Sequence, residues 1–277
     1  MALIQVNMMS KSLMRTVTFN VILPVDKFGS VEIPEREEKP YKTLYLLHGI
    51  FGNYTDWVTG TCVQRYADEK NLAVVMPSGE NMFYVDQPDT HNNYGEFVGK
   101  ELVEITRKMF PLSRKREDTY IGGLSMGGYG AFRNGLKYHD TFGRIVALSA
   151  ALITDGLADR TDDVSLFIEG RTYAEGVFGD LAQVKGSEKD PKWLAAKIKE
   201  EGAAFPDIYM ACGTEDGLLG VNRDFKDFLV GLGVGLTYEE GPGVHDWNFW
   251  DCYIKKAIDW LPLEEQAAGI NSGNVGV

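Results

Sequence analysis

The chain has 277 residues, enough for one large α/β domain or two smaller ones, and its 44% hydrophobic and 25% charged residues are typical of a soluble globular protein. Its formal net charge of −12 at pH 7 disfavours nucleic acids and anionic membrane surfaces as partners. No run approaches the roughly 18 apolar residues of a transmembrane helix, and the first residues lack the pattern of a signal peptide. We therefore expect a cytoplasmic protein.

Three cysteines occur far apart along the chain, at Cys62, Cys212 and Cys252. An odd number without any C-x-x-C pair indicates neither a zinc site nor a disulfide framework. Free thiols in a reducing compartment fit this pattern best. The sequence predicts no metal and no organic cofactor, and it leaves the oligomeric state open, a homo-oligomer included.

The predicted strands fall into two groups along the chain. Residues 2–23 read as two strands joined by a turn near Ser10, because the second half is rich in β-branched residues. After a charged loop come short apolar runs, which are typical of strands buried on both faces. These runs are residues 43–47, 72–76, 119–123, 145–148, 208–212 and 235–239.

Helical periodicity appears between these runs. The predicted helices are residues 95–110, 125–137, 223–232 and 246–260. Strands that alternate with helices predict a mostly parallel sheet with helices on both faces, and the leading hairpin adds antiparallel strands at one edge. We expect a single α/β domain over residues 1–277. Residues 152–206 break the rhythm, and we expect them to form a cap-like insertion with one helix over residues 192–201.

A nucleophile motif follows the strand at 119–123. The run GLSMGGYG at 123–130 matches G-x-S-x-G between a buried strand and a helix, with Ser125 in the central position. A side chain on so sharp a turn needs small neighbours two residues away, and Gly123 and Gly127 meet that need. The N-terminus of the following helix adds N–H groups near developing negative charge.

A serine hydroxyl needs a base and a group that orients the base. After such a turn the acid comes next along the chain and the histidine last. Of the histidines after Ser125, His139 lies at a helix end, whereas His245 lies in the loop between the last strand and the last helix. Asp216 and Glu215 both follow the strand at 208–212 and are both candidates for the acid, with Asp224 a weaker third.

The oxyanion hole requires backbone N–H donors beside the nucleophile. One comes from the residue after the nucleophile, Met126, and the other from the loop after the first buried parallel strand. The run HGIFG at 48–52 follows that strand directly, so we expect Ile50 to supply the second N–H.

Together these motifs resemble the esterase D-like branch of the α/β-hydrolases, which includes tributyrin esterases, feruloyl and acetyl-xylan esterases and S-formylglutathione hydrolases. The resemblance covers most of the chain, and it implies the α/β-hydrolase fold and a two-step acyl transfer to water from a small-molecule ester. In this branch the aspartate of the GTED run is the acid, which favours Asp216 over Glu215, and the histidine of the HDW run is the base. The matching runs are NVILP at 20–24, LHG at 47–49, DW at 56–57, GLSMGGYGA at 123–131, CGTED at 212–216 and GVHDW at 243–247.

The resemblance is closest to the tributyrin-type esterases. S-formylglutathione hydrolases usually carry a cysteine after the oxyanion glycine and a histidine inside the nucleophile motif. Here the first place holds the run FGN at 51–53, which begins with Phe51, and the second holds Tyr129. Both differences argue against S-formylglutathione as the substrate. We expect short acyl esters, followed by hydroxycinnamoyl and acetylated sugar esters. An acyltransferase with the same triad and a non-catalytic binding homologue remain alternatives.

Several aromatic residues are candidates for the mouth of the site, although core packing explains them equally well. In the insertion, Trp193 and Phe167 are expected to limit the depth of the pocket. The candidate substrate-binding residues are Phe51 and Trp57, with Phe83 and Tyr84 beside them.

Overall fold

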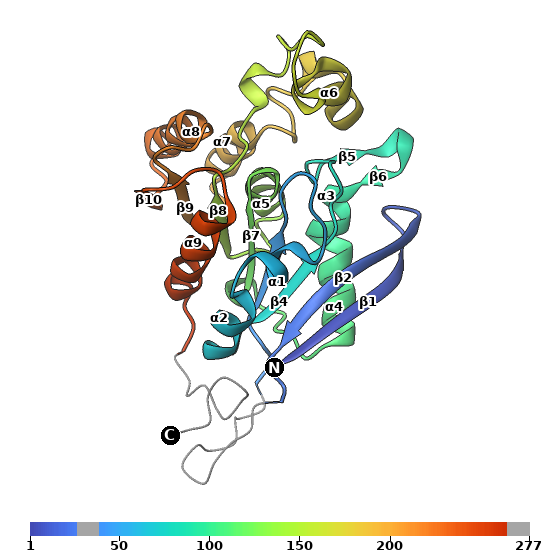
Figure 1. The fold of residues 1–277 in the computed structure, drawn as a ribbon, viewed down its shortest axis with the longest axis vertical. Helices are drawn as coiled ribbons and strands as arrows, with labels where there is room; N and C mark the ends of the chain where they lie inside the picture. The colour runs from blue at the N-terminus through green and yellow to red at the C-terminus, as the bar shows by residue number, and fades with distance from the viewer. Residues whose placement is uncertain (27–38, 265–277) are drawn as a thin grey trace.

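The computed structural model describes residues 1–26 and 39–264. Within these residues eight strands form one sheet in the order β1-β2-β4-β3-β7-β8-β9-β10 (Figure 1). The sheet strands are β1 (Ala2–Ser10), β2 (Arg15–Leu23), β3 (Thr43–Leu47), β4 (Ala73–Pro77), β7 (Thr119–Leu124), β8 (Arg144–Leu148), β9 (Asp207–Gly213) and β10 (Thr237–Gly241).

The N-terminal hairpin is confirmed as the antiparallel edge of the sheet. β1 pairs with β2 throughout its length, and β2 continues antiparallel onto β4. The other strands of this sheet, β4, β3, β7, β8, β9 and β10, run parallel to one another. The carboxyl ends of β3, β7, β8 and β9 therefore lie at one edge, which is where functional loops gather in parallel sheets.

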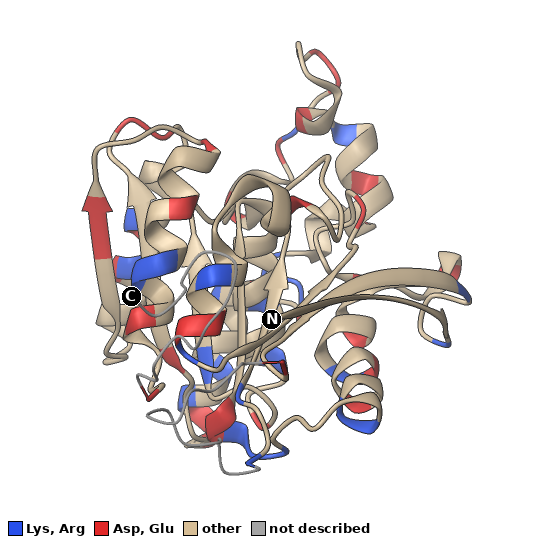
Figure 2. Cartoon of the chain, turned by 60° about the horizontal axis from the view of Figure 1, so that its bottom comes forward, with Lys and Arg blue, Asp and Glu red and all other residues tan. Residues whose placement is uncertain are grey.

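Helices cover both faces of the sheet. On one face α4, α5 and α8 bury a large apolar cluster, and on the other α1, α2 and α9 bury a second one. In Figure 2 the ribbon of the inner strands is mostly tan, and the charged residues lie on helices, loops and the edge strand β10. The α-helices are α1 (Asp56–Gly60), α2 (Val63–Glu69), α3 (Tyr94–Glu96), α4 (Leu102–Met109), α5 (Met126–Lys137), α6 (Arg171–Phe178), α7 (Pro191–Glu201), α8 (Leu219–Gly231) and α9 (Trp247–Trp260).

Most predicted boundaries agree with the structure to within one or two residues. The predicted helix at 95–110 is observed as α3, a π-helical turn (Phe97–Glu101) and α4 in succession. Helix α8 begins at Leu219, four residues earlier than predicted. Strand β10 begins two residues later than predicted, since residues 232–236 form the turn after α8, with Gly233 at φ +71°.

Three helices and a small strand pair were not predicted. The short helices α1 and α2 mix buried and exposed residues over too few turns to give a clear period. Helix α6 lies in the insertion, and β5 (Asp86–Gln87) and β6 (Asn92–Asn93) form a separate two-stranded sheet beside it.

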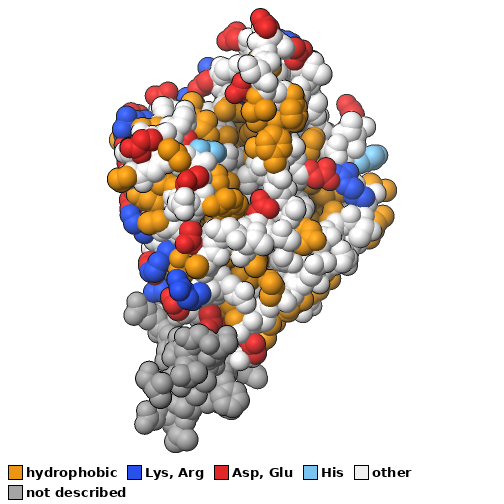
Figure 3. All heavy atoms as spheres, in the orientation of Figure 1, with side chains coloured by type: hydrophobic (Ala, Val, Ile, Leu, Met, Phe, Trp, Pro, Cys, Tyr) orange, Lys and Arg blue, Asp and Glu red, His pale blue; other side chains and the backbone are white. Residues whose placement is uncertain are grey.

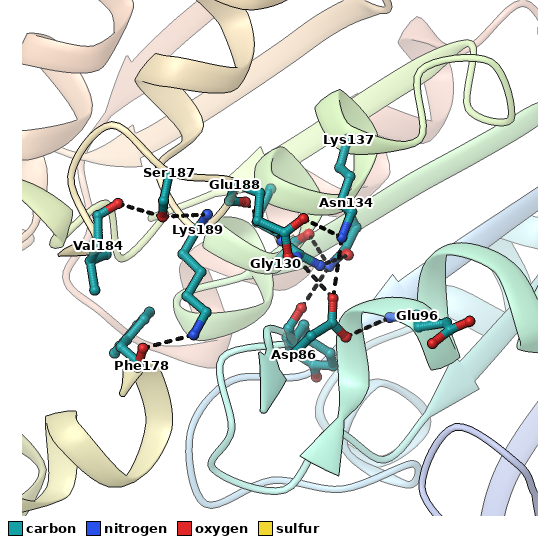
Figure 4. Close-up of polar contacts among 12 residues, drawn as sticks. Asp86, Glu96, Gly130, Asn134, Lys137, Phe178, Val184, Ser187, Glu188 and Lys189 are labelled. Carbon is teal, nitrogen blue, oxygen red and sulfur yellow. Dashed lines mark hydrogen bonds and ion pairs between the residues drawn. The ribbon is translucent and has the colours of Figure 1, made fainter. Parts of the chain in front are cut away.

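A buried charge network attaches the insertion to the helix that follows Ser125. Arg133 on α5 is fully buried, and its guanidinium lies 2.9 Å from both Asp86 and Glu188. Lys137, one turn further along, contacts the same two carboxylates at 3.4 and 2.7 Å (Figure 4). Burial opposes ionisation of Asp86, but Arg133, the Glu96 N–H and Lys137 together lower the pKa of this carboxyl.

Backbone contacts strengthen this attachment. Lys189 extends its ammonium to the carbonyl of Phe178, 2.7 Å away, and so joins the end of α6 to the segment before α7 (Figure 4). Tyr129 on α5 donates its hydroxyl hydrogen to the Lys189 carbonyl at 2.5 Å. The base of the insertion is therefore tied to α5 by charges and by hydrogen bonds.

Replacing Arg133 by Met is expected to lower the free energy of unfolding by roughly 3 kcal/mol. This is the lower end of the cost of removing one partner of a buried ion pair, because Lys137 still faces Asp86 and Glu188 is half exposed. Chemical denaturation measures the change. The control is Lys255→Met, which breaks an exposed pair with Asp259 and should cost less than about 0.5 kcal/mol. Equal losses in the two variants would contradict a stabilising role for the buried network.

Candidate active site

Ser125 lies on the turn between β7 and α5 with a strained backbone. Its φ of +53° and ψ of −117° are unfavourable for a residue with a side chain. Its N–H donates to the Leu148 carbonyl and its carbonyl accepts from Tyr129 and Ala151, so the main chain is held on both sides. The side chain is 8% exposed.

Two glycines make this turn sterically feasible. A Cβ on Gly123 would lie 2.4 Å from the Gly127 carbonyl oxygen, and a Cβ on Gly127 would lie 2.4 Å from the Leu47 carbonyl oxygen. Both distances are far below van der Waals contact. The turn is thus packed directly against the carboxyl end of β3, and only glycine fits at these two positions.

His245 and Asp216 complete a hydrogen-bonded row with Ser125. The His245 Nε2 lies 2.9 Å from Ser125 Oγ, and the His245 Nδ1 lies 2.8 Å from Asp216 Oδ2. A carboxylate only accepts hydrogen bonds, so Nδ1 carries the proton and Nε2 is free to accept from the serine. The structure therefore brings the three sequence-predicted residues together from the ends of β7, β9 and β10.

Asp216 is held in its ionised form. Burial by itself would raise the pKa of this carboxyl, but hydrogen bonds from His245, the Leu218 N–H and Ser149 outweigh burial and lower it. The Leu218 N–H donates to Asp216 Oδ1 at 2.8 Å. The side chain opposite His245 thus keeps its negative charge.

The other candidates from the sequence occupy different places. Glu215 is exposed and its Oε2 accepts from the Gly243 N–H at 2.7 Å, so it braces the loop that carries His245. Asp224 is exposed on α8. His139 lies at the end of α5, where its Nδ1 contacts the Leu136 carbonyl at 3.1 Å.

Ser149 and Trp250 support the row without having been predicted. Ser149 is fully buried, has φ +47° and follows β8. The indole N–H of Trp250 donates to Ser149 Oγ at 3.2 Å, and the same ring meets His245 edge to face with centroids 4.9 Å apart. The sequence signal that could have indicated Ser149 is its position directly after a predicted parallel strand. Nothing in the sequence distinguished Trp250.

His48 fixes the loop after β3. The Gly79 N–H donates to its Nε2 at 2.8 Å, so the proton is on Nδ1, which donates to the Gly49 carbonyl at 2.6 Å. Burial lowers the pKa of this imidazole. Tyr84 donates its hydroxyl hydrogen to the His48 carbonyl at 3.0 Å. Both ring nitrogens are engaged in holding the loop, so His48 is a structural residue.

The two predicted oxyanion residues flank Ser125. Met126 is the first residue of α5, where N–H groups lack partners within the helix. A Cβ on Gly49 would lie 3.6 Å from the Ser125 Cβ. Gly49 therefore lies next to Ser125, and Ile50 is the following residue of the loop.

The prediction for Trp57 is corrected by its position. Trp57 is 1% exposed, packs edge to face on Trp247 and donates its indole N–H to the Leu47 carbonyl at 3.0 Å. Its ring anchors α1 under the loop after β3 and does not reach the surface, so it does not line an open pocket. Phe83 and Tyr84 are likewise buried.

Phe51 alone among these aromatic residues is exposed, at 62%. Its ring meets that of Phe167, which is 59% exposed, with centroids 6.2 Å apart. Figure 3 shows hydrophobic side chains gathered below the insertion on the face in view. The pair therefore joins the loop after β3 to the tip of the insertion.

A separate cavity of about 320 Å³ lies between the insertion and α8. Its lining includes Leu152, Arg160, Lys192 and Val221 but none of Ser125, Asp216 and His245. In residues 1–26 and 39–264, no cluster of three or more His, Cys, Asp or Glu side chains is arranged to hold a metal ion. No helix in that part of the chain is both long and apolar enough to cross a membrane.

Replacing Gly127 by Ala is expected to destabilise the protein by about 3 kcal/mol or more, because the added methyl overlaps the Leu47 and His48 carbonyl oxygens. Thermal denaturation measures the loss. Gly176→Ala is the matched control: Gly176 lies in α6 with open space around its Cα, and alanine there should stabilise by up to about 1 kcal/mol. A neutral Gly127→Ala variant would contradict the close packing of the turn.

Comparisons with known proteins identify the family of the chain. A family model described as "Putative esterase" matches residues 10–260. The chain is 47% identical over 261 residues to an acetyl esterase of Caldicellulosiruptor saccharolyticus, covering 94% of this chain and 98% of that one.

Two solved structures from Staphylococcus aureus are each 36% identical and cover 94% of this chain and 98% of theirs. One is a fluorophosphonate-binding serine hydrolase with a TM-score of 0.82, and the other is an S-formylglutathione hydrolase with a TM-score of 0.80. The chain therefore belongs to this esterase family: it is a serine esterase, a carboxylic ester hydrolase with the α/β-hydrolase fold.

Proposed function

We propose that Ser125, His245 and Asp216 form the catalytic triad and that the preferred substrates are esters of short acyl groups. The hydrogen-bonded row from Ser125 Oγ through His245 to Asp216 carries this proposal. The strained turn at Ser125 supports it, since such strain is characteristic of a nucleophile on a strand-to-helix turn.

The reaction proceeds in two steps. Ser125 Oγ attacks the ester carbonyl while His245 Nε2 takes its proton, and the ionised Asp216 stabilises the resulting imidazolium. The tetrahedral intermediate collapses, the alcohol leaves with the proton from His245, and an acyl-Ser125 ester remains. Water then attacks this ester, gives its proton to His245, and the acid departs as Ser125 recovers its hydrogen.

Backbone N–H groups stabilise the charge on the carbonyl oxygen during both steps. We assign this role to Ile50 and Met126, which flank Ser125 from the loop after β3 and from the start of α5. A donor of this kind is typically worth about 3 kcal/mol. The partial positive charge at the N-terminus of α5 acts in the same direction.

The similarity to an acetyl esterase at 47% identity supports a short acyl group. The exposed Phe51–Phe167 pair offers an apolar surface for the remainder of the ester, and so keeps hydroxycinnamoyl and acetylated sugar esters among the candidates. A thioester of formic acid belongs in the same comparison, because one similar structure is an S-formylglutathione hydrolase.

The first experiment compares wild type with Ser125→Ala on p-nitrophenyl esters from acetate to decanoate, methyl ferulate, an acetylated xyloside and S-formylglutathione. We expect kcat to fall by about three orders of magnitude or more in the variant, and wild-type activity to be highest on the shortest acyl chains. A fluorophosphonate probe followed by mass spectrometry should label Ser125.

The control is Ser165→Ala, which alters an exposed serine of the insertion. Activity that persists in Ser125→Ala would refute the nucleophile. Product esters that accumulate when an alcohol is added would favour an acyltransferase, and an inactive wild type that still binds esters would favour a binding protein.

Truncating Phe51 to Ala is expected to raise KM for methyl ferulate about tenfold and to change kcat less, because the variant removes apolar contact area and no reacting group. Steady-state kinetics measures both constants. Met109→Ala, on α4, removes another large exposed apolar side chain elsewhere and should leave KM unchanged. An unchanged KM in Phe51→Ala would exclude the ring from substrate binding.

A further inference from the structure

Residues 78–84, the segment after β4, make several hydrogen bonds to the loop that carries Ile50. The Gly79 N–H and the Tyr84 hydroxyl bind His48, as described above. Further along the loop, the Tyr54 N–H donates to Ser78 Oγ at 3.2 Å. Between these contacts the Phe51 N–H donates to Asn81 Oδ1 at 2.8 Å.

The hydrogen bond at Phe51 fixes a strained turn. The Gly52 N–H closes a tight turn on the Gly49 carbonyl, and Phe51 occupies its third position with φ +67°. That position favours glycine, so an external contact is needed to hold a residue with a side chain there. The acceptor on Asn81 fixes the peptide between Ile50 and Phe51, and hence the direction of the chain on the carboxyl side of Ile50.

Asn81 is in turn held by the insertion. Tyr173 on α6 donates its hydroxyl hydrogen to the Asn81 carbonyl at 2.5 Å. The Tyr173 ring meets Phe167 with centroids 5.7 Å apart, and Phe167 meets Phe51. The four residues Phe51, Asn81, Tyr173 and Phe167 therefore form a closed ring of contacts between the loop and the insertion.

We propose that Asn81 is a positioning residue for the oxyanion hole: its side chain sets the loop that bears the Ile50 N–H, and its carbonyl links that loop to the insertion. The proposal rests on the proposed function, since it assigns a support to one of the two oxyanion donors. Asn81 acts on the site through the backbone N–H of Phe51 and takes no part in proton transfer. Because the Phe51 N–H donates to Asn81, that N–H is not available to the oxyanion, which agrees with Ile50 as the donor.

The test compares wild type with Asn81→Ala on p-nitrophenyl acetate. Displacing an oxyanion donor weakens transition-state binding more than substrate binding, so kcat should fall about 10- to 100-fold with KM changed less than about threefold. The affinity of a boronic acid, which forms a tetrahedral adduct with Ser125, should fall by a similar factor. The affinity of the product acetate, which forms no such adduct, should stay within about twofold.

Asn92→Ala is the matched control. Asn92 on β6 also accepts hydrogen bonds through its amide oxygen, from Arg15, but it does not contact the loop. This variant should lower the melting temperature without changing kcat or boronate affinity. If Asn81→Ala behaves in the same way, Asn81 is merely structural and the proposal is wrong.

Tyr173→Phe tests the link to the insertion and still applies if Asn81→Ala fails to fold. Removing the hydroxyl should lower kcat about three- to tenfold. The double variant should be no worse than Asn81→Ala alone, because both changes act on the loop through the hydrogen bond from the Phe51 N–H to the Asn81 side chain. Unchanged kcat in Tyr173→Phe, or strictly additive effects, would overturn the link. An active Ser125→Ala variant would instead refute the triad itself, so the two failures are distinguishable.

Discussion

The backbone strain at Ser125 is the constraint on which the site depends. A positive φ at this residue costs roughly 1–3 kcal/mol and persists only where the surroundings hold it. Here the turn is pressed between β3 and β8, with Gly127 against the Leu47 carbonyl and the Ser125 N–H bound to Leu148. The same close packing brings the loop after β3 beside Ser125, so the proposed nucleophile and the loop with the proposed oxyanion donor are positioned by one contact.

The remaining polar groups of the site are supported from a second layer of buried residues. Ser149 and Leu218 bind Asp216, and Trp250 contacts both Ser149 and His245. On the opposite side, His48 and Asn81 hold the loop after β3 that carries Ile50. Three side chains can keep their relative positions to within fractions of an ångström only when such neighbours restrict their rotamers.

The insertion is attached at two places of different chemistry. At its base, Arg133 and Lys137 bind it to α5 through a buried charge network. Towards its tip, Tyr173 donates a hydrogen bond to Asn81, and Phe167 contacts Phe51 in the loop after β3. Both attachments lead to elements that carry residues of the candidate site. The insertion is therefore anchored both to α5, the helix that follows Ser125, and to the loop after β3.

Local sequence was sufficient for much of the fold and for the three central residues. Buried parallel strands are short and almost wholly apolar, which makes runs such as Thr43–Leu47 readable, and the glycines around Ser125 report a turn that only they permit. The order of serine, acid and histidine then limited the base to His245, and the resemblance to known esterases separated Asp216 from Glu215. Tertiary structure alone decided which aromatic rings are exposed: Trp57 is in the core, and Phe51 is at the surface. It also decided the supporting residues Ser149, Trp250 and Asn81, because the hydrogen bonds from Trp250 to Ser149 and from Phe51 to Asn81 join residues 30 or more positions apart and leave no periodic or spacing signal.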